Sequence, residues 1–521
     1  MSPAARIRVN AGDIVSPIDN RLYSSFVEHM GRAVYTGIYE PGHPAADADG
    51  FRGDVLELIR PLDLAFIRYP GGNFVSGYRW EDGIGPKESR PVRPELAWFA
   101  LEPNQVGTDE FLSFCQSADV EPMLAVNLGT GTPQDAANLL EYCNFPGGTH
   151  YSELRRQNGH AKPYDVKLWC LGNEMDGPWQ IGAKTADEYG RVACETAKLM
   201  KWLDPTIELV ACGSSFHGMP TFGSWERTIL RHCYQYIDYL SLHQYYQNLD
   251  GDLPSFLARS SEMAGFIREV ADICSEIKTE LGSGKDIRLS FDEWNVWYHF
   301  RQEGKTPALW TVARPIEEEL YNFADAILVG SMLITLINQA DVVKIACLAQ
   351  LINTLAPIMT QPGGPAWVQT TYFPFLFTSK YGRGVALKPE VDGPTYDCAI
   401  GSQIACIDCA VVLNETRDEV RIFLVNKSLT DAIDCQIILE DLQISRVIET
   451  ISLTGYPADA VNTANQESVQ PKMNQMAFRA AESGLNANLE PLSWHLVRLS
   501  VQSSESFFLD RPDHHDPTAK N

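Results

Sequence analysis

The sequence lacks the segments by which proteins enter or cross membranes. Its longest apolar stretch, residues 326–337, is too short to span a bilayer, and no apolar core of a secretion signal follows Met1. The twelve cysteines are scattered, and the one close pair, Cys406 and Cys409, has no second Cys or His pair to complete a zinc site. We therefore expect a cytoplasmic protein with reduced thiols that does not bind a membrane.

Positive charge is also scarce. The chain has 42 Lys and Arg residues against 67 Asp and Glu residues, which gives a net charge of −25. Such a surface repels phosphate backbones, so nucleic acid is not an expected partner. Hydrophobic residues make up 45% and charged residues 21% of the 521 positions, as in a globular protein large enough for several domains.

Common cofactor and nucleophile motifs are incomplete in this chain. A dinucleotide-binding loop would need glycine at Gln134, a phosphate loop would need Ser or Thr at Asp286, and a nucleophile elbow would need glycine at His217. No set of His and Glu residues has the spacing of a zinc site. We therefore expect a protein that works without a cofactor and without a metal.

Strand-like apolar runs alternate with helical patterns between about residues 20 and 350. The eight runs are Leu22–Val27, Leu64–Tyr69, Pro122–Leu128, Val166–Leu171, Ile207–Cys212, Ile237–His243, Ile287–Phe291 and Val342–Leu348. Helical segments between them include Phe51–Leu62, Ala186–Leu203, Pro254–Leu281 and Pro315–Ala340. This alternation predicts an α/β fold, a (β/α)₈ barrel over residues 18–370, with the site at the carboxyl ends of its strands.

After residue 365 the pattern changes to short alternating runs separated by polar turns, for example Ala410–Leu413 and Val420–Asn426. We predict an all-β, jelly-roll-like sandwich over residues 371–502, joined by a strand from residues 1–17. The tail, residues 503–521, is rich in Ser, Asp, His and Pro and is expected to be disordered.

Two glutamates carry the strongest functional signal. Glu174 follows the fourth apolar run and Glu293 the seventh, so in a barrel both carboxylates would project into one pocket. Trp294 and Trp297 follow Glu293, and tryptophan faces stack on sugar rings. A pair of carboxylates across a small gap can cleave a glycosidic bond. On the residues alone, such a pair and two solvated loop glutamates remain equally open.

Other polar residues stand at the ends of the predicted strands. Arg68 and Asn73 flank the turn Pro70–Gly72, where glycine allows a sharp bend and Arg68 can keep a catalytic carboxylate ionised. The same placement recurs after the first, sixth and eighth runs at Glu28, His243, Tyr245 and Gln350. This recurrence, more than any one residue, indicates a polar pocket.

Three motifs in order resemble those of one known family. Arg68-Tyr-Pro-Gly-Gly-Asn73, Gly172-Asn-Glu-Met-Asp-Gly-Pro-Trp179 and Asp292-Glu-Trp-Asn-Val-Trp-Tyr298 closely resemble the motifs of the α-L-arabinofuranosidases of glycoside hydrolase family 51. The resemblance runs from about residue 5 to residue 500. It implies a (β/α)₈ barrel with a C-terminal β-sandwich. It also implies retaining, exo-acting hydrolysis of terminal non-reducing α-L-arabinofuranosyl residues from arabinan- or arabinoxylan-derived oligosaccharides.

The resemblance also implies individual roles, with Glu174 as general acid/base and Glu293 as nucleophile. The residues implied to line the sugar subsite are Glu28, Arg68, Asn73, Asn173, Tyr245 and Gln350, bordered by Trp98, Trp179 and Trp297. His243 stands at a strand end close to Tyr245, and we expect it to bind substrate with them. Members of the family are often intracellular and commonly hexameric, which implies a cytoplasmic homohexamer that binds arabinose-containing oligosaccharides.

Other interpretations stay open. Another retaining barrel glycosidase, such as an endoglucanase or a β-xylosidase, would use the same pair of glutamates. A barrel that binds carbohydrate without cleaving it is the alternative from a different class. The β-sandwich could also act as a separate sugar-binding module.

Overall fold

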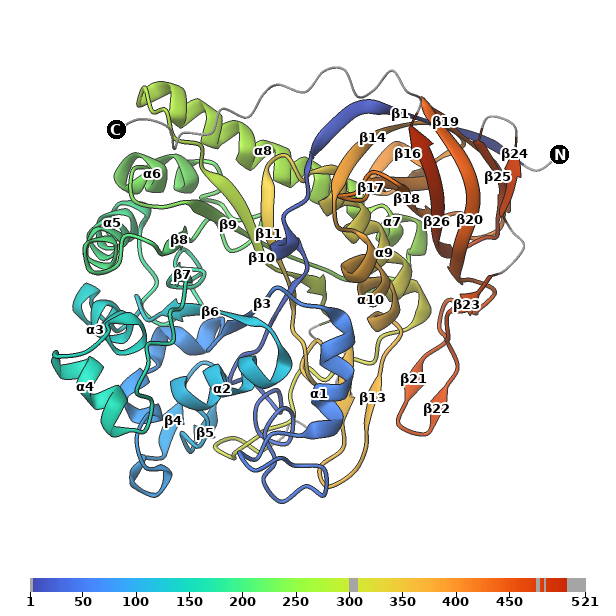
Figure 1. The fold of residues 1–521 in the computed structure, drawn as a ribbon. Helices are drawn as coiled ribbons and strands as arrows, with labels where there is room; N and C mark the ends of the chain where they lie inside the picture. Colours follow the sequence, from blue (N-terminus) through green and yellow to red (C-terminus); the bar gives the residue numbers. More distant parts are fainter. Residues whose placement is uncertain (1–2, 299–307, 475–477, 482–483, 504–521) are drawn as a thin grey trace, which may run out of the picture.

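Eight parallel strands close into a barrel in the computed structural model, which describes residues 3–298, 308–474, 478–481 and 484–503 (Figure 1). In chain order the barrel strands are β2 (Ser24–Phe26), β3 (Phe66–Tyr69), β6 (Glu121–Val126), β7 (Leu168–Leu171), β8 (Glu208–Ala211), β9 (Tyr239–Tyr246), β10 (Arg288–Val296) and β11 (Val343–Ala349). Each strand overlaps one of the eight predicted apolar runs, so the predicted barrel is confirmed.

Helices cover the outside of the barrel (Figure 1). They are α1 (Gly53–Ile59), α2 (Thr108–Ala118), α3 (Pro133–Asn144), α4 (His150–Gln157), α5 (Ala186–Leu203), α6 (Ser224–Cys233), α7 (Leu253–Leu257), α8 (Arg259–Glu280), α9 (Phe323–Asn338) and α10 (Tyr372–Tyr381). Within the described ranges, no helix has both the length and the apolar character needed to cross a membrane.

The helix predicted from Pro315 begins later than expected, at Phe323. The side chain of Asn322 accepts a hydrogen bond from the Asp325 backbone N–H at 3.0 Å, and the Asp325 carboxylate accepts from the Asn322 N–H at 2.8 Å. This reciprocal pair is a capping box, which fixes the first turn at that position. The segment before Asn322 forms no helix among the described residues, and its Glu317 lines a cavity at the carboxyl end of the barrel.

Strands β9 and β10 extend farther than the apolar runs that predicted them. They stay paired in parallel beyond the predicted ends, with Glu293 opposite His243 and Asn295 opposite Tyr245. The prediction that Glu293, His243 and Tyr245 follow their strands is therefore wrong, because all three lie within them. Apolar character stops before the backbone pairing does, so the sequence pattern does not distinguish the polar end of a strand from a loop.

The second part of the chain is a ten-stranded sheet that curls around its own apolar core. From edge to edge the strands are β23 (Lys472–Met473), β20 (Leu442–Leu453), β26 (Ser493–Ser503), β18 (Glu419–Asn426), β17 (Ile407–Leu413), β14 (Val385–Asp392), β1 (Ala4–Pro17), β19 (Ile433–Glu440), β25 (Gly484–Leu489) and β24 (Phe478–Ala481). β24 contacts β20, so the two ends of the sheet approach each other. The two layers of the predicted sandwich are thus joined by continuous hydrogen bonding.

The first strand of the chain lies in the middle of this sheet, between β14 and β19. The division of the chain near residue 370 stays a prediction, and the predicted tail lies outside the described residues from 504 onward.

All twelve cysteines are free. Cys406 and Cys409 are buried in the apolar core of the sheet.

Helix α9 connects the barrel to the sheet. Residues 323–337 of α9 are all buried, and the helix contacts α8 and β10 on one side and β14, β17, β18 and β26 on the other. A close approach occurs at Gly330, where an added Cβ would lie 2.4 Å from Cδ1 of the buried Trp494. Only glycine leaves room for the indole at this position.

We expect Gly330→Ala to destabilise the protein by about 1–3 kcal/mol, because the methyl group overpacks the interface between α9 and β26. Gly265→Ala is the matched control: it lies in α8, nothing is within 4 Å of its added Cβ, and it should stabilise by up to about 1 kcal/mol through helix propensity. Urea midpoints measure both changes. Equal or higher stability of Gly330→Ala would contradict this account of the interface.

Candidate active site

A cavity of about 850 Å³ opens at the carboxyl end of the barrel. Nine of the twelve predicted site residues line it: Glu28, Asn73, Trp98, Glu174, Trp179, Tyr245, Glu293, Trp297 and Gln350. The other three, Arg68, Asn173 and His243, are buried and lie behind this lining in contact with it. The structure therefore brings all twelve together around one cavity.

Glu174 and Glu293 face each other across this cavity. Glu174 lies in the loop after β7, whereas Glu293 lies within β10. One carboxylate oxygen of each, together with a ring nitrogen of His243, lie within 4.8 Å of one another. Carboxyl groups about 5–5.5 Å apart can attack and protonate the same glycosidic bond, whereas a pair that must admit a water lies about 6.5–9.5 Å apart.

Glu293 is held by two of the predicted site residues. Nη1 of Arg68 donates to Glu293 Oε1 at 2.6 Å, and the Tyr245 hydroxyl donates to Oε2 at 2.8 Å. The second terminal nitrogen of Arg68 donates to Asn173 Oδ1 at 2.6 Å. Arg68 is 1% exposed, so these bonds form away from water. Both carboxylate oxygens of Glu293 are thus fixed in direction.

Glu174 is held from the opposite side and is less enclosed. The indole Nε1 of Trp179 donates to Glu174 Oε2 at 2.9 Å, and Nδ1 of His243 lies 3.0 Å from Oε1. The Glu174 side chain is 11% exposed, against 6% for Glu293. The half-exposed Trp179 stands at the mouth of the cavity. Glu174 therefore lies between the buried cluster and the opening.

The sequence reasoning missed Asp292, which completes a buried charge cluster. Its Oδ2 lies 3.4 Å from Nε of Arg68, and its Oδ1 lies 3.4 Å from Nε2 of His243. Adjacent residues of a regular strand point to opposite faces. Here the pairing of β10 shifts register between Ser290 and Glu293, so that Asp292 and Glu293 both contact Arg68. Such a bulge leaves no recognisable sign in the sequence.

His243 lies among three carboxylates. Burial alone would lower the pKa of His243, but the neighbouring Glu293, Asp292 and Glu174 raise it to about 10. Burial would likewise raise the pKa of Asp292, but Arg68 and His243 lower it below its ordinary value. His243 is therefore an imidazolium at neutral pH, with Nδ1 hydrogen-bonded to Glu174 and Nε2 3.4 Å from Asp292 Oδ1 in an ion pair without a hydrogen bond.

Glu28 forms the inner end of the cavity. Its Oε1 accepts hydrogen bonds from the Phe74 backbone N–H at 2.9 Å and from Nε1 of Trp98 at 3.0 Å. An added Cβ at Gly71 or Gly72 would lie 2.8 Å from the Glu28 side chain, so these glycines serve close approach as well as the turn. Burial raises the pKa of Glu28 to about 8. Below that pH the carboxyl is protonated and can donate a hydrogen bond.

Apolar side chains surround the mouth of the cavity. Leu96 and Phe99 come from the tip between β4 (Arg93–Glu95) and β5 (Ala100–Glu102), and Phe216 comes from the loop after β8. All three are exposed, and the sequence reasoning missed them. Phe216 could have been found, because it follows the fifth predicted run. The outer part of the cavity thus offers flat apolar surfaces, while the inner part offers hydrogen bonds.

The residues Glu174, His243 and Glu293 also form the one group in the described ranges whose donor atoms are close enough to hold a metal ion. A metal would need a neutral histidine with a free ring nitrogen. Nδ1 of His243, the ring nitrogen nearest to both glutamates, instead forms a hydrogen bond with Glu174 Oε1 at 3.0 Å and lies 3.6 Å from Glu293 Oε2. The donor set therefore fits an imidazolium between carboxylates better than a cation site.

A closed parallel barrel with two converging glutamates is the arrangement of the barrel glycosidases. Two family models match the chain: the α-L-arabinofuranosidase 1 domain over residues 58–256 and the α-L-arabinofuranosidase C-terminal domain over residues 292–493. The chain belongs to the α-L-arabinofuranosidases of glycoside hydrolase family 51.

Named relatives are similar over nearly the whole chain. An intracellular exo-α-(1→5)-L-arabinofuranosidase of Bacillus subtilis is 53% identical over 96% of this chain and 99% of its own length. An exo-α-(1→6)-L-arabinofuranosidase of Bifidobacterium longum is 45% identical over 95% of this chain and 97% of its own. A solved family 51 α-L-arabinofuranosidase of the same organism superposes with a TM-score of 0.92 at 41% identity, covering 96% and 100% of the two chains.

Replacing Glu28 with Gln should change how stability depends on pH. The folded pKa of Glu28, about 8, exceeds its ordinary value of 4.5, so its stabilising contribution is fully present below about pH 4.5 and is lost as pH rises through 8. We expect wild-type unfolding free energy to fall more steeply than that of Glu28→Gln between pH 5 and 8, by up to about 1.4 kcal/mol per pH unit.

Urea unfolding at each pH measures this difference. Glu57→Gln, an exposed change in α1, is the control and should keep the wild-type slope. Parallel slopes for wild type and Glu28→Gln would contradict a protonated Glu28 at the inner end of the cavity.

Proposed function

We propose that this protein is a retaining exo-α-L-arabinofuranosidase that removes terminal non-reducing α-L-arabinofuranosyl residues, with Glu293 as nucleophile and Glu174 as general acid/base. The observation that carries the proposal is the approach of the two carboxylates to within 4.8 Å from β10 and the loop after β7. That spacing suits direct attack by one carboxylate and protonation by the other, and it leaves too little room for the water of an inverting reaction.

In the first step Glu293 attacks the anomeric carbon while Glu174 protonates the departing oxygen, so the glycosidic bond breaks as the glycosyl ester forms. In the second step Glu174 takes a proton from water, whose oxygen attacks the same carbon and releases Glu293. The different surroundings favour this assignment. Arg68 and Tyr245 direct both oxygens of Glu293, whereas Glu174 lies nearer the opening, where the leaving group must stand.

The shape of the cavity supports removal of single terminal residues. Glu28 and Gln350 in its lining are 3% and 1% exposed, which favours a cavity that is closed on their side over a groove open at both ends. A furanosyl ring there would meet hydrogen-bonding groups on Glu28, Asn73 and Gln350. The rest of the substrate would point outward, past Trp179 and Phe216. The polar inner end therefore binds the sugar that is cleaved, and the apolar mouth binds the leaving group.

Arabinan- and arabinoxylan-derived oligosaccharides are the proposed substrates. Relatives of comparable similarity are named for (1→5) and for (1→6) linkages, and the closer match with the Bacillus subtilis enzyme favours (1→5). We also propose that the protein acts inside the cell, as that relative is named to do, and that it assembles as a homohexamer, which follows from the family resemblance. The elution mass of the full chain tests the assembly.

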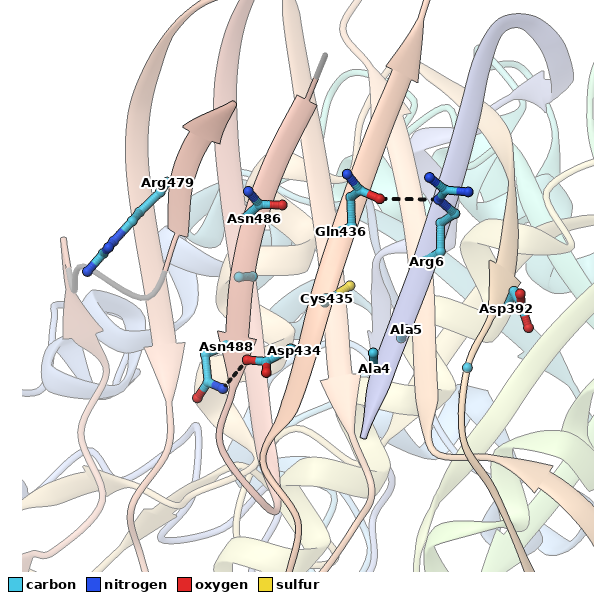
Figure 2. Close-up of a pocket in the computed structure, with 12 residues that line it drawn as sticks. Ala4, Ala5, Arg6, Asp392, Asp434, Cys435, Gln436, Arg479, Asn486 and Asn488 are labelled. Carbon is cyan, nitrogen blue, oxygen red and sulfur yellow. Dashed lines mark hydrogen bonds between the residues drawn. The ribbon is translucent and has the colours of Figure 1, made fainter. Parts of the chain in front are cut away.

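A sugar-binding role for the sheet is less well supported. The outer surface of β1, β19, β25 and β24 carries an open groove, in which Arg6 donates to Gln436 at 3.2 Å and Asn488 donates to Asp434 at 2.7 Å (Figure 2). Some of the polar groups in this groove thus form hydrogen bonds with one another and are less available to a ligand. The twelve described residues that line it include no aromatic side chain, so it offers no surface on which a sugar ring could stack.

Replacing each glutamate should separate the two roles. Glu293→Ala should lose turnover of 4-nitrophenyl α-L-arabinofuranoside, because the carboxylate that forms the ester is removed. Glu174→Ala should lose about 10²–10⁴-fold on substrates with poor leaving groups, and azide should restore turnover of the nitrophenyl substrate as a glycosyl azide of retained configuration. Glu57→Ala is the control. Product of inverted configuration would contradict double displacement.

Removing one aromatic surface from the mouth should affect oligosaccharides more than aryl substrates. We expect Phe216→Ala to raise KM for arabinotriose about three- to tenfold, the equivalent of about 0.5–1.5 kcal/mol of lost stacking, with little change for the nitrophenyl substrate. Trp202→Ala, an exposed change on α5 away from the cavity, is the control. An unchanged KM for arabinotriose would place Phe216 outside the leaving-group site.

A further inference from the structure

The cluster behind the cavity holds a balanced set of charges. Arg68 and His243 are the cations, and Asp292 and Glu293 are the anions that contact them. Glu174 completes the set and contacts only His243 among these four. While Glu174 carries a proton, the two cations and two anions cancel. Because these side chains are largely buried, water screens their charges only weakly, and a net charge on the cluster would be costly.

The position of His243 has a consequence for catalysis. Nδ1 of His243 lies 3.0 Å from Glu174 Oε1 and 3.6 Å from Glu293 Oε2, so one N–H is within reach of both reacting carboxylates. On its other side Nε2 lies 3.4 Å from Asp292 Oδ1. Arg68, by contrast, contacts Glu293 and Asp292 and does not reach Glu174 among its described contacts.

We propose that His243 is a fixed imidazolium that neutralises whichever of Glu174 and Glu293 carries the negative charge, and that Asp292 is the positioning residue that holds it there. This inference rests on the proposed double displacement. When Glu293 becomes an ester, its negative charge disappears as Glu174 gives up its proton and becomes the anion. When water releases the sugar, Glu174 regains a proton and Glu293 regains its charge. The cluster stays neutral throughout, and His243 gives up no proton.

The titratable groups that face His243 agree with this role. They are Glu174 from the loop after β7 and Asp292 and Glu293 from β10, with the Tyr245 hydroxyl on its own strand directed at Glu293. These carboxylates raise the pKa of His243 to about 10. A histidine that shuttled protons would need a pKa near the working pH instead. The opposing carboxylates therefore suit a permanent charge.

The test uses neutral replacements and the pH profile of kcat/KM. His243→Asn keeps an N–H donor but removes the positive charge, so both limbs of the bell-shaped profile should move to higher pH and kcat should fall about 10²- to 10³-fold. Asp292→Asn removes a negative charge at nearly the same shape, so both limbs should move to lower pH. The double variant restores neutrality, and its limbs should return toward those of the wild type.

Different outcomes separate this proposal from simpler roles. If the variants lose activity without moving the limbs, or move them in the same direction, His243 acts only as a structural donor and the proposal is overturned. If the double variant is displaced as far as either single variant, charge balance is overturned. ¹³C NMR of wild-type protein labelled at histidine Cε1, with His243→Asn for assignment, needs no folded Asp292 variant; a neutral His243 at pH 7 would also overturn the proposal.

Failure of the proposed function would look different. If the wild type does not hydrolyse arabinofuranosides but cleaves another glycoside, the substrate assignment fails, yet the limbs can be measured on that glycoside and the charge proposal is still tested. If the wild type hydrolyses arabinofuranosides and the limbs do not move as stated, the function stands and the charge proposal fails.

Discussion

The active end of the barrel depends on the contact of two buried cations with two neighbouring carboxylates. Arg68 and Asp292 are each 1% exposed, and His243 is 2% exposed. Taking an ion out of water costs several kcal/mol, so neither cation would be stable there without its carboxylates. The partners come from β3, β9 and β10, which are brought together only when the barrel closes. Closure of the fold and assembly of the reaction centre are therefore one structural event.

The ten-stranded sheet contributes to this centre from a distance. The described residues that line the cavity all lie between Glu28 and Leu355, before the sheet strands that follow the barrel. The link is α9, which contacts β10 on one side and four strands of the sheet on the other. β10 carries both Asp292 and Glu293. A buried helix behind that strand limits its movement, and the sheet in turn keeps the helix buried.

The sequence was most informative for polar residues that stand at the carboxyl ends of barrel strands. Glu174, Arg68 and Gln350 were predictable because a parallel barrel directs such positions into one pocket. Asp292 was not, because the register shift that turns it inward depends on the pairing of β10 with its neighbours. Phe99 lies on a hairpin outside the barrel repeat, so no periodic pattern pointed to it. The raised pKa of Glu28 follows from burial, which a sequence does not state.

The order of environments along the cavity accounts for recognition of an uncharged substrate. Ions lie deepest and neutralise one another, so the substrate need not supply a charge. The protonated Glu28, with Asn73 and Gln350, can then recognise hydroxyl groups by hydrogen bonds alone. Near the mouth, Trp179 and Phe216 contribute flat surfaces that tolerate different leaving groups. Selectivity should therefore be strict for the ring that is cleaved and broader for the group attached to it, because hydrogen bonds fix individual hydroxyl groups whereas an aromatic face accepts many apolar surfaces.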